Sequence, residues 1–225
     1  MKRVVFTALV AGFVLLAASA AHADNVFIGL GANGGAPGVV AASSTGAATL
    51  PPSVILGWTV SATVFGTPPA GPEPNLEGFT VDASDTTGGI SSLQIYITEG
   101  DLSSPTGINT FISGLTSNLL LGNIASVTES TYIDTGNGLF TTTCGTCSLL
   151  ASHTFTGIGS IDIGAATPSL AAPYSETEVF DIQATGVGGV QDTITISNAP
   201  EPGTLTLFGS GLFGLAGLLR RKLAV

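Results

Sequence analysis

Two cysteines three positions apart form the most reactive pair in the sequence. Cys144-Gly145-Thr146-Cys147 has the spacing of a redox or metal-binding pair. A structural zinc site needs four ligands, and the only other thiol or imidazole between residues 24 and 197 is His153. A thioredoxin-like pair lies in a βαβ setting at the start of a helix, whereas these cysteines stand among threonines. We therefore expect a small-loop disulfide, with redox activity, metal binding and a free thiol as alternatives.

His153 is the next candidate for chemistry, as the base of a Ser-His-Asp triad. Serines and aspartates are abundant, but no Gly-x-Ser-x-Gly elbow occurs in the sequence. A triad is defined by its geometry, which a sequence does not supply. We expect no catalytic role for His153 and no enzyme activity in the chain.

Acidic residues come in near pairs along the chain. The pairs are Asp82 with Asp85, Glu99 with Asp101, and Glu176 with Glu178. Carboxylate oxygens in such clusters are calcium ligands, and two carboxylates are also the machinery of a glycosidase. No EF-hand loop is present, so we expect unpaired surface charge. A calcium site built from the first two pairs and a hydrolytic carboxylate pair are the alternatives.

A glycine-rich run from Gly29 to Gly34 matches, letter by letter, the fingerprint of dinucleotide-binding proteins. That fingerprint works between a strand and a helix whose N-terminus faces the pyrophosphate. The residues that follow are rich in Gly, Pro, Ala and Ser and show no amphipathic helical pattern. We therefore expect a glycine-rich loop here and no cofactor.

The distribution of charge excludes one class of partner. The chain has 225 residues, with 5 Lys and Arg, 15 Asp and Glu, and a net charge of −10. All the basic residues lie near the two ends, so residues 4–219 contain no Lys or Arg. Binding to nucleic acid requires cations that neutralise phosphates, and we therefore expect no nucleic-acid partner.

The hydrophobic pattern between the ends alternates with period two, as in half-buried strands. It is clearest at residues 57–65, 93–98, 180–184 and 193–197, with shorter candidates at 26–30, 78–83, 118–127, 139–143 and 149–155. Asn137-Gly138 is a hairpin signal, and residues 31–53 and 66–77 are typical of long loops. The sequence predicts an all-β domain over residues 24–197, an antiparallel β-sandwich of the jelly-roll or Ig-like kind, with a partly open barrel as the alternative.

Residues 1–23 have the three parts of a secretory signal peptide. Two cationic residues come first, residues 4–18 are almost entirely apolar, and small residues close the segment. Ala21 and Ala23 satisfy the small-x-small rule of signal peptidase, which predicts cleavage before Asp24. Signal peptidase is thus an expected partner, and an uncleaved membrane anchor is the alternative.

The C-terminal residues have a second three-part order. Pro200-Glu201-Pro202 is followed by an apolar stretch over residues 203–219 and then by Arg220, Arg221 and Lys222. The apolar stretch is at the lower limit of length for a helix that crosses a membrane. A basic triplet at its end stays on the cytoplasmic side. The sequence therefore predicts one C-terminal transmembrane helix with the triplet as its stop-transfer signal.

The segment NAPEPGTLTLFGSGLFGLAGLLRRK resembles the PEP-CTERM sorting tail of bacterial envelope proteins, a tail also labelled "ice-binding protein C-terminal domain". The resemblance covers residues 198–222 and rests on motif, apolar helix and basic cluster occurring in this order at the C-terminus. It implies that an exosortase recognises Pro200, Glu201 and Pro202 and processes the tail. Hosts of such tails are mostly Gram-negative bacteria that make exopolysaccharide.

Together these features predict an exported protein of the cell surface or extracellular matrix, with a structural, adhesive or carbohydrate-associating role and no catalysis. Its parts are the signal peptide (1–23), the acidic β-domain (24–197) and the sorting tail (198–222). Its expected partners are signal peptidase, exosortase, the inner membrane through residues 203–219, and exopolysaccharide. The alternative is a secreted hydrolase of extracellular polysaccharide, which would need a deep cleft holding two acids and a pKa displaced by burial.

Overall fold

The computed structural model describes residues 24–55, 57–67, 75–88, 92–143, 145–199 and 210–211. The strands are β1 (Asn25–Ala32), β2 (Gly38–Ser43), β3 (Ala47–Ile55), β4 (Trp58–Phe65), β5 (Asn75–Asp85), β6 (Ser92–Leu102), β7 (Thr110–Asp134), β8 (Cys147–Phe155), β9 (Gly159–Ala166) and β10 (Tyr174–Asn198). The predicted signal peptide, sorting motif and basic triplet lie outside the described residues, as does Cys144. Within those residues, no helix has the length and apolarity that a membrane crossing requires.

Two long strands organise the fold. β7 and β10 are 25 residues each and pair with one another along their length. Their ladder is interrupted midway, between Ala184 and Gly188, and there Gly122 has a φ of 67°. β6 pairs with residues 174–183 of β10, before this bend, whereas β5 pairs with residues 188–197, after it. The folded β7/β10 ribbon therefore supplies two adjacent strands to each of two sheets.

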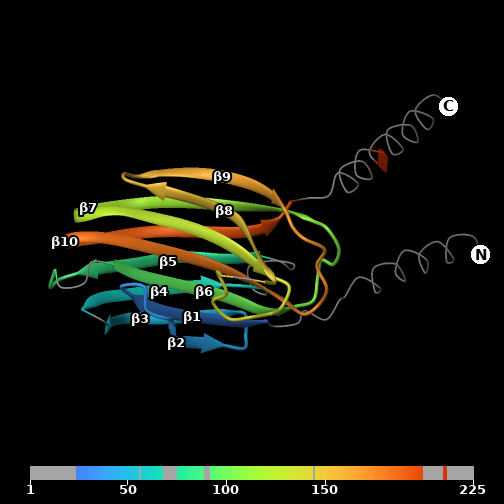
Figure 1. The fold of residues 1–225 in the computed structure, drawn as a ribbon, viewed down its shortest axis with the longest axis horizontal. Coiled ribbons are helices and arrows are strands. Elements are labelled where there is room, and N and C mark those ends of the chain that lie inside the picture. Colours follow the sequence, from blue (N-terminus) through green and yellow to red (C-terminus); the bar gives the residue numbers. More distant parts are fainter. Residues whose placement is uncertain are drawn as a thin grey trace, which may run out of the picture.

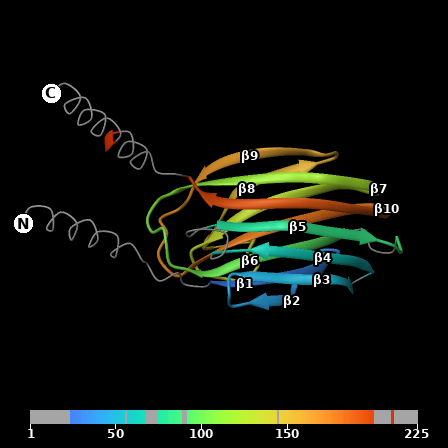
Figure 2. The ribbon, with the colours of Figure 1, turned by 180° about the vertical axis from the view of Figure 1, so that it is seen from behind.

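The two sheets form a sandwich of antiparallel strands. The first sheet has the order β2-β1-β6-β10-β7-β8 and uses residues 174–184 of β10 and 124–134 of β7. The second sheet has the order β3-β4-β5-β10-β7-β9 and uses residues 188–198 of β10 and 110–122 of β7. Figures 1 and 2 show the layers, with β2 and β3 along one side and β8 and β9 along the other. The predicted all-β class and antiparallel pairing are confirmed.

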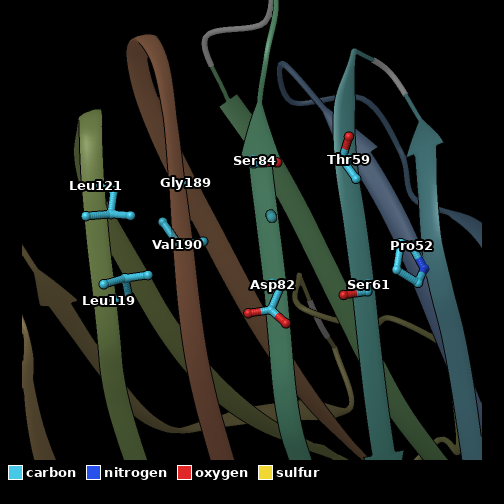
Figure 3. Close-up of a pocket in the computed structure, with 10 residues that line it drawn as sticks. Pro52, Thr59, Ser61, Asp82, Ser84, Leu119, Leu121, Gly189 and Val190 are labelled. Atoms are coloured by element: carbon cyan, nitrogen blue, oxygen red, sulfur yellow. The ribbon is translucent and has the colours of Figure 1, made fainter.

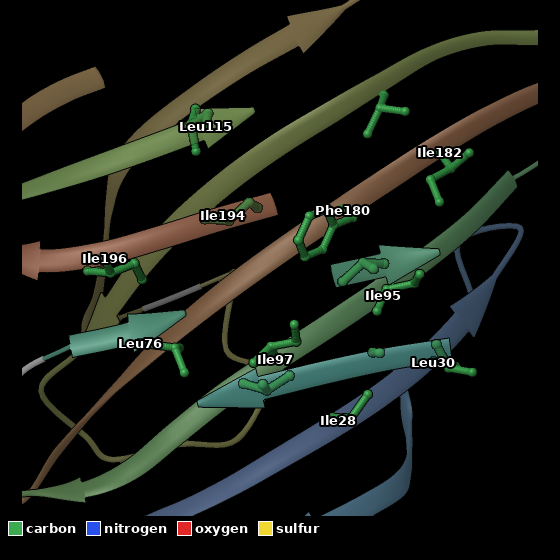
Figure 4. Packing of buried hydrophobic residues seen from close by; sticks show 14 of the residues in the cluster. Ile28, Leu30, Leu76, Ile95, Ile97, Leu115, Phe180, Ile182, Ile194 and Ile196 are labelled. Atoms are coloured by element: carbon green, nitrogen blue, oxygen red, sulfur yellow. The ribbon is translucent and has the colours of Figure 1, made fainter. Parts of the chain in front are cut away.

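Inward-facing residues of both sheets form one hydrophobic core (Figure 4). The first sheet contributes Ile28, Leu30, Ile95, Ile97, Phe180 and Ile182, and the second contributes Leu76, Leu115, Ile194 and Ile196. Trp58, the single tryptophan of the chain, is fully buried at the start of β4. Because residues 4–219 contain no Lys or Arg, hydrophobic burial and hydrogen bonds hold this core without Lys or Arg ion pairs.

Several local predictions are wrong. Residues 31–53, predicted as a loop, contain β2 and most of β3, because Gly, Pro and Ser obscure the short apolar alternation around Ala48 and Leu50. Residues 139–143, predicted as a strand, lie in an irregular connection. Asn137-Gly138 does not make a two-residue hairpin, since this connection runs from residue 135 to residue 146. β9 has no counterpart among the predicted strands.

This β7–β8 connection, residues 135–146, folds over the outer face of the first sheet. The ring of Phe140 lies 5.8 Å from that of Tyr96, centroid to centroid. It also occupies the space where a side chain at position 29 would project, which explains Gly29. The backbone N–H of Phe140 donates to Thr98 Oγ1 at 3.1 Å. The connection therefore covers part of the first sheet, and the second sheet carries the open groove described next.

Candidate functional site

A shallow groove crosses the outer face of the second sheet (Figure 3). Its volume is about 330 Å³. The groove is lined by residues of five strands. They include Pro52 of β3, Thr59 and Ser61 of β4, Asp82 and Ser84 of β5, Gly189 of β10, and Leu119 and Leu121 of β7. β10 lies between β5 and β7. Adjacent strands are about 4.8 Å apart, so five strands give the groove a span of about 19 Å.

The groove combines apolar surface with hydrogen-bonding groups. Leu119 and Leu121, which are 39% and 56% exposed, form its apolar end. Asp82 lies in the middle, where its Oδ1 accepts a hydrogen bond of 2.9 Å from Gln191 Nε2. Hydroxyl side chains of β4 lie beyond it (Figure 3). Such a surface can pack against a ligand with an apolar face and also bond to its hydroxyl groups.

The groove lies near the bend of the β7/β10 ribbon, far from the residues at which the domain begins and ends. Gly189 comes directly after the bend, and β10 ends at Asn198. The strand from Gly189 to Asn198 covers about 30 Å at ~3.3 Å per residue. β1 starts at the same end of the sandwich at which β10 finishes (Figures 1 and 2). The groove therefore lies toward the end of the sandwich opposite to the start of β1 and the end of β10.

A second feature is a set of acidic side chains between the sheets, which we name the inter-sheet carboxyls. They are Glu99, Glu129, Glu176, Glu178 and Asp192, each with no exposed surface. Glu99 of β6 is the direct cross-strand partner of Glu176 of β10. Glu178 follows on the same face of β10, and its Oε2 lies against Gly78 of the opposite sheet. The interior thus holds several acidic groups in a small space.

Burial changes the acidity of these groups. It raises the pKa of Glu178 well above its ordinary value, and repulsion from Glu176, Glu129 and Glu99 raises it further. Burial, together with repulsion from Asp192, raises the pKa of Glu129 to about 9. Burial also raises the pKa of Asp192 to about 7. These carboxyls favour their neutral form because a charge in the apolar interior loses its hydration.

The expectation of surface charge is wrong for Asp85, Glu99, Glu176 and Glu178, all of which are buried. The alternation that places Phe180 and Ile182 on the inner face of β10, continued backward, places Glu178 and Glu176 on that face too. The alternation in the sequence therefore indicated that Glu176 and Glu178 face inward, but acidic residues are normally expected at the surface. Asp192 is a further buried acid, and the alternation of Ile194 and Ile196, continued backward, places it on the inner face in the same way. Glu129 of β7 is buried too.

The four calcium candidates do not come together. Asp82 lines the groove of the second sheet, Asp85 is buried at the end of β5, Glu99 lies between the sheets, and Asp101 is exposed on the first sheet. Asp85 accepts hydrogen bonds from the backbone N–H groups of Thr87 and Gly88. Among the described residues, no three or more His, Cys, Asp or Glu side chains are placed to hold a metal ion.

The remaining chemical candidates lie on β8. Cys147 is disulfide-bonded. The chain's other cysteine, Cys144, is outside the described residues. The ring of His153 stands edge-on to that of Phe155, with centroids 4.6 Å apart. The cross-strand neighbour of His153 is Glu129, whose carboxyl lies in the interior.

Residues 198–222 match the PEP-CTERM protein-sorting motif. The chain therefore carries the signal of an exported, exosortase-processed protein of the cell surface. The motif includes the predicted Pro200-Glu201-Pro202 triplet and the basic cluster. No curated protein matches the chain.

Solved structures resemble the domain only distantly. They include the bacteriophage CBA120 tailspike protein 4 (11% identity, TM-score 0.33), with 66% of this chain matched to 20% of that one. TmCBM61 in complex with β-1,4-galactotriose is 12% identical (TM-score 0.32), with 64% of this chain matched to 90% of that one. The K1 cleaved adhesin domain of Lys-gingipain from Porphyromonas gingivalis is 12% identical (TM-score 0.32), with 68% of this chain matched to 94% of that one.

Proposed function

We propose that this protein is a non-catalytic, adhesive component of the bacterial envelope that holds neutral polysaccharide in the groove of its second sheet. The sorting motif accounts for its delivery to the cell surface. The observation that carries the adhesive role is the position of the groove, on an open sheet face near the bend of the β7/β10 ribbon and away from Asn198, where β10 ends. A ligand of the surrounding matrix reaches such a face without obstruction from the membrane.

The chemistry of the groove suits a sugar chain. A pyranose ring presents C–H groups on its faces and hydroxyls at its edge. Leu119, Leu121 and Pro52 offer apolar contact to the former, while Asp82 and the hydroxyls of β4 and β5 bond to the latter. The hydrogen bond from Gln191 holds the Asp82 side chain in place, which reduces the entropy lost on binding.

The charge of the domain selects against acidic polysaccharides. The groove contains a carboxylate, and residues 4–219 contain no Lys or Arg to pair with a uronate or sulfate group. A polyanion would be repelled by the net negative charge at low ionic strength. The ligand class that fits is therefore an uncharged polymer.

The burial of the acids favours binding over hydrolysis. A glycosidase holds two carboxyls on either side of an accessible glycosidic bond. Here the acids with strongly raised pKa, Glu129, Glu178 and Asp192, are fully buried. Asp82 is the only acid that lines the groove in the described part of the chain. A carboxylate pair that could reach a substrate is thus missing from this groove.

The test uses the full chain in detergent and the host's exopolysaccharide, separated into neutral and acidic fractions. We expect retardation in affinity electrophoresis by the neutral fraction only, and release of no reducing ends. Leu121→Ala should weaken the retardation at least fivefold. Leu149→Ala is the matched control, because Leu149 is also 56% exposed but lies on β8 of the first sheet.

Three results would contradict this proposal. If the acidic fraction retarded the protein as much as the neutral fraction does, the negative charge of the domain would not select against acidic polysaccharides. Equal effects of Leu121→Ala and Leu149→Ala would place any binding outside the groove. Turnover of either fraction would support the hydrolase instead.

A further inference from the structure

The inter-sheet carboxyls have a consequence that is independent of the groove. We propose that the domain folds with several of these carboxyls protonated, so that folding takes up protons and the folded state weakens as the pH rises. The domain would then be most stable in mildly acidic surroundings and would loosen in alkaline ones.

The inter-sheet carboxyls lie so close together that protonation of several of them is the way to relieve their mutual repulsion. Glu99 and Glu176 are direct cross-strand partners, so their Cβ atoms lie about 4.5–5.5 Å apart. Glu178 adds a third carboxyl on the same face of β10. Glu99 accepts a hydrogen bond from the backbone N–H of Thr67, which suits an ionised carboxylate there. Additional negative charges beside it, shielded from water, would repel one another strongly.

The groups that face Glu178 supply no positive charge. They are Glu176 on the same strand, Glu99 on β6, Glu129 on β7 and the backbone of Gly78 on β5. Across the whole stretch of residues 4–219 there is no Lys or Arg. Ion pairing with those residue types is therefore excluded as the means of neutralisation.

The surroundings of Glu129 and Asp192 are similar. Glu129 faces Asp192 and the backbone of Thr116 from the opposite sheet, with His153 beside it on β8. Asp192 lies beside Ser117 of β7, and Asp82, on the outer face of the neighbouring strand β5, adds a repulsive negative charge. His153 is the single basic side chain among these neighbours, and its ring stands against that of Phe155.

The sign of the effect follows from the direction of the shifts. The ordinary pKa is 4.5 for Glu and 3.8 for Asp, and the folded values are about 9 for Glu129 and about 7 for Asp192. Between the unfolded and folded pKa, the folded state holds a proton that the unfolded state has released. The stability that these two groups contribute is therefore full below about pH 4 and is lost as the pH rises through the folded pKa values.

The effect is measurable in the full chain. Each proton taken up on folding raises the unfolding equilibrium constant about tenfold per pH unit. Urea unfolding of the chain in detergent can be followed by the fluorescence of Trp58, which reports this domain alone because it is the single tryptophan. We expect the unfolding constant to rise at least tenfold per unit between pH 6 and pH 8, in 0.5 M NaCl as well as at low salt.

Amide variants identify the groups responsible. Glu178→Gln and Glu129→Gln remove an ionisable proton while preserving shape, so each should flatten the dependence of stability on pH. Asp162→Asn is the matched control, because it removes one charge from an exposed position on β9 and should leave the slope unchanged. If an amide variant does not fold, infrared spectroscopy of the wild-type chain at pH 8 should still detect a protonated carboxyl that unfolding removes.

Four outcomes would overturn the proposal. Stability that is constant or increases from pH 5 to pH 8 would exclude proton uptake. If the dependence of stability on pH disappears in 0.5 M NaCl, or if Asp162→Asn flattens it as much as Glu178→Gln does, that dependence arises from repulsion between surface charges, which salt screens. Recovery of alkaline stability in millimolar Ca²⁺, abolished by Glu178→Gln, would show that a cation neutralises the cluster. Absence of the infrared band at pH 8 would show that the carboxyls are ionised.

Discussion

At the scale of single residues, the pKa of Asp134 is shifted in the direction opposite to that of the inter-sheet carboxyls. It lies at the end of β7, and its oxygens accept hydrogen bonds from the backbone N–H groups of Gly136 at 2.9 Å and Gly138 at 3.0 Å. Burial alone would raise the pKa of Asp134, but hydrogen bonds from Thr146 and these backbone groups lower it below its ordinary value. The same residue type is thus charged where backbone donors surround it and favours the neutral form where they are few.

Asp134→Asn should lower the free energy of unfolding by about 1.5–3 kcal/mol at pH 7, the contribution of hydrogen bonds to a charged group. Because the folded pKa is lowered, this contribution is present above about pH 4 and is lost as the pH falls through the folded value. Urea titrations at pH 7 and below pH 3 measure the free energy of unfolding with this contribution present and with it lost. A loss of equal size at the two pH values would contradict the role of the charge, and Asp162→Asn controls for the change in net charge.

At the scale of elements, the bend of the β7/β10 ribbon determines the sandwich. Gly122 adopts a left-handed φ there, and a Cβ at this position would lie 2.6 Å from the carbonyl oxygen of Val187. A backbone atom cannot move aside as a flexible side chain can. The residue must be glycine if the two halves of the ribbon are to fold against one another.

Gly122→Ala should therefore lower the free energy of unfolding by at least ~2 kcal/mol, from the left-handed backbone and the contact together. Gly157→Ala is the matched control, since nothing lies within 4 Å of a Cβ there. Urea midpoints followed by Trp58 fluorescence compare the two. Equal midpoints for both variants would show that the bend tolerates a side chain.

At the scale of the whole molecule, the sorting tail follows directly from the end of β10. Ala199, the residue before Pro200, still donates its backbone N–H to Thr110 O, at 2.8 Å. Proline fixes φ and lacks an N–H, so the triplet cannot extend this pairing. The triplet thus begins one residue after the last described residue of the domain.

Replacing Pro200 and Glu201 together by Ala should block processing of the tail and retain the full tail in the membrane fraction. Intact mass of protein from the native host, with and without the substitution, measures this directly and also reports cleavage before Asp24. Asp162→Ala serves as a control for the lost acid. A mass distribution equal to that of the wild type would contradict recognition of the triplet.

Much of the fold could be predicted because alternation is a local property. The strands around Trp58, Ile95 and Ile194 follow directly from period-two patterns. β2, β3 and β9 were obscured because edge strands bury less surface and therefore show weaker alternation. The groove residues could be anticipated only in part: of three consecutive leucines, Leu119 and Leu121 must share one face of β7 and Leu120 the other.

The sequence by itself determined the sorting signal and the all-β class, since both depend on the order and spacing of neighbouring residues. Only the tertiary structure decided that Glu129 and Asp192, far apart in the chain, interact between the sheets. That encounter depends on the folding of the β7/β10 ribbon, which brings distant halves of two strands together. The groove depends on the same bend, because its lining comes from five strands whose order no local pattern encodes.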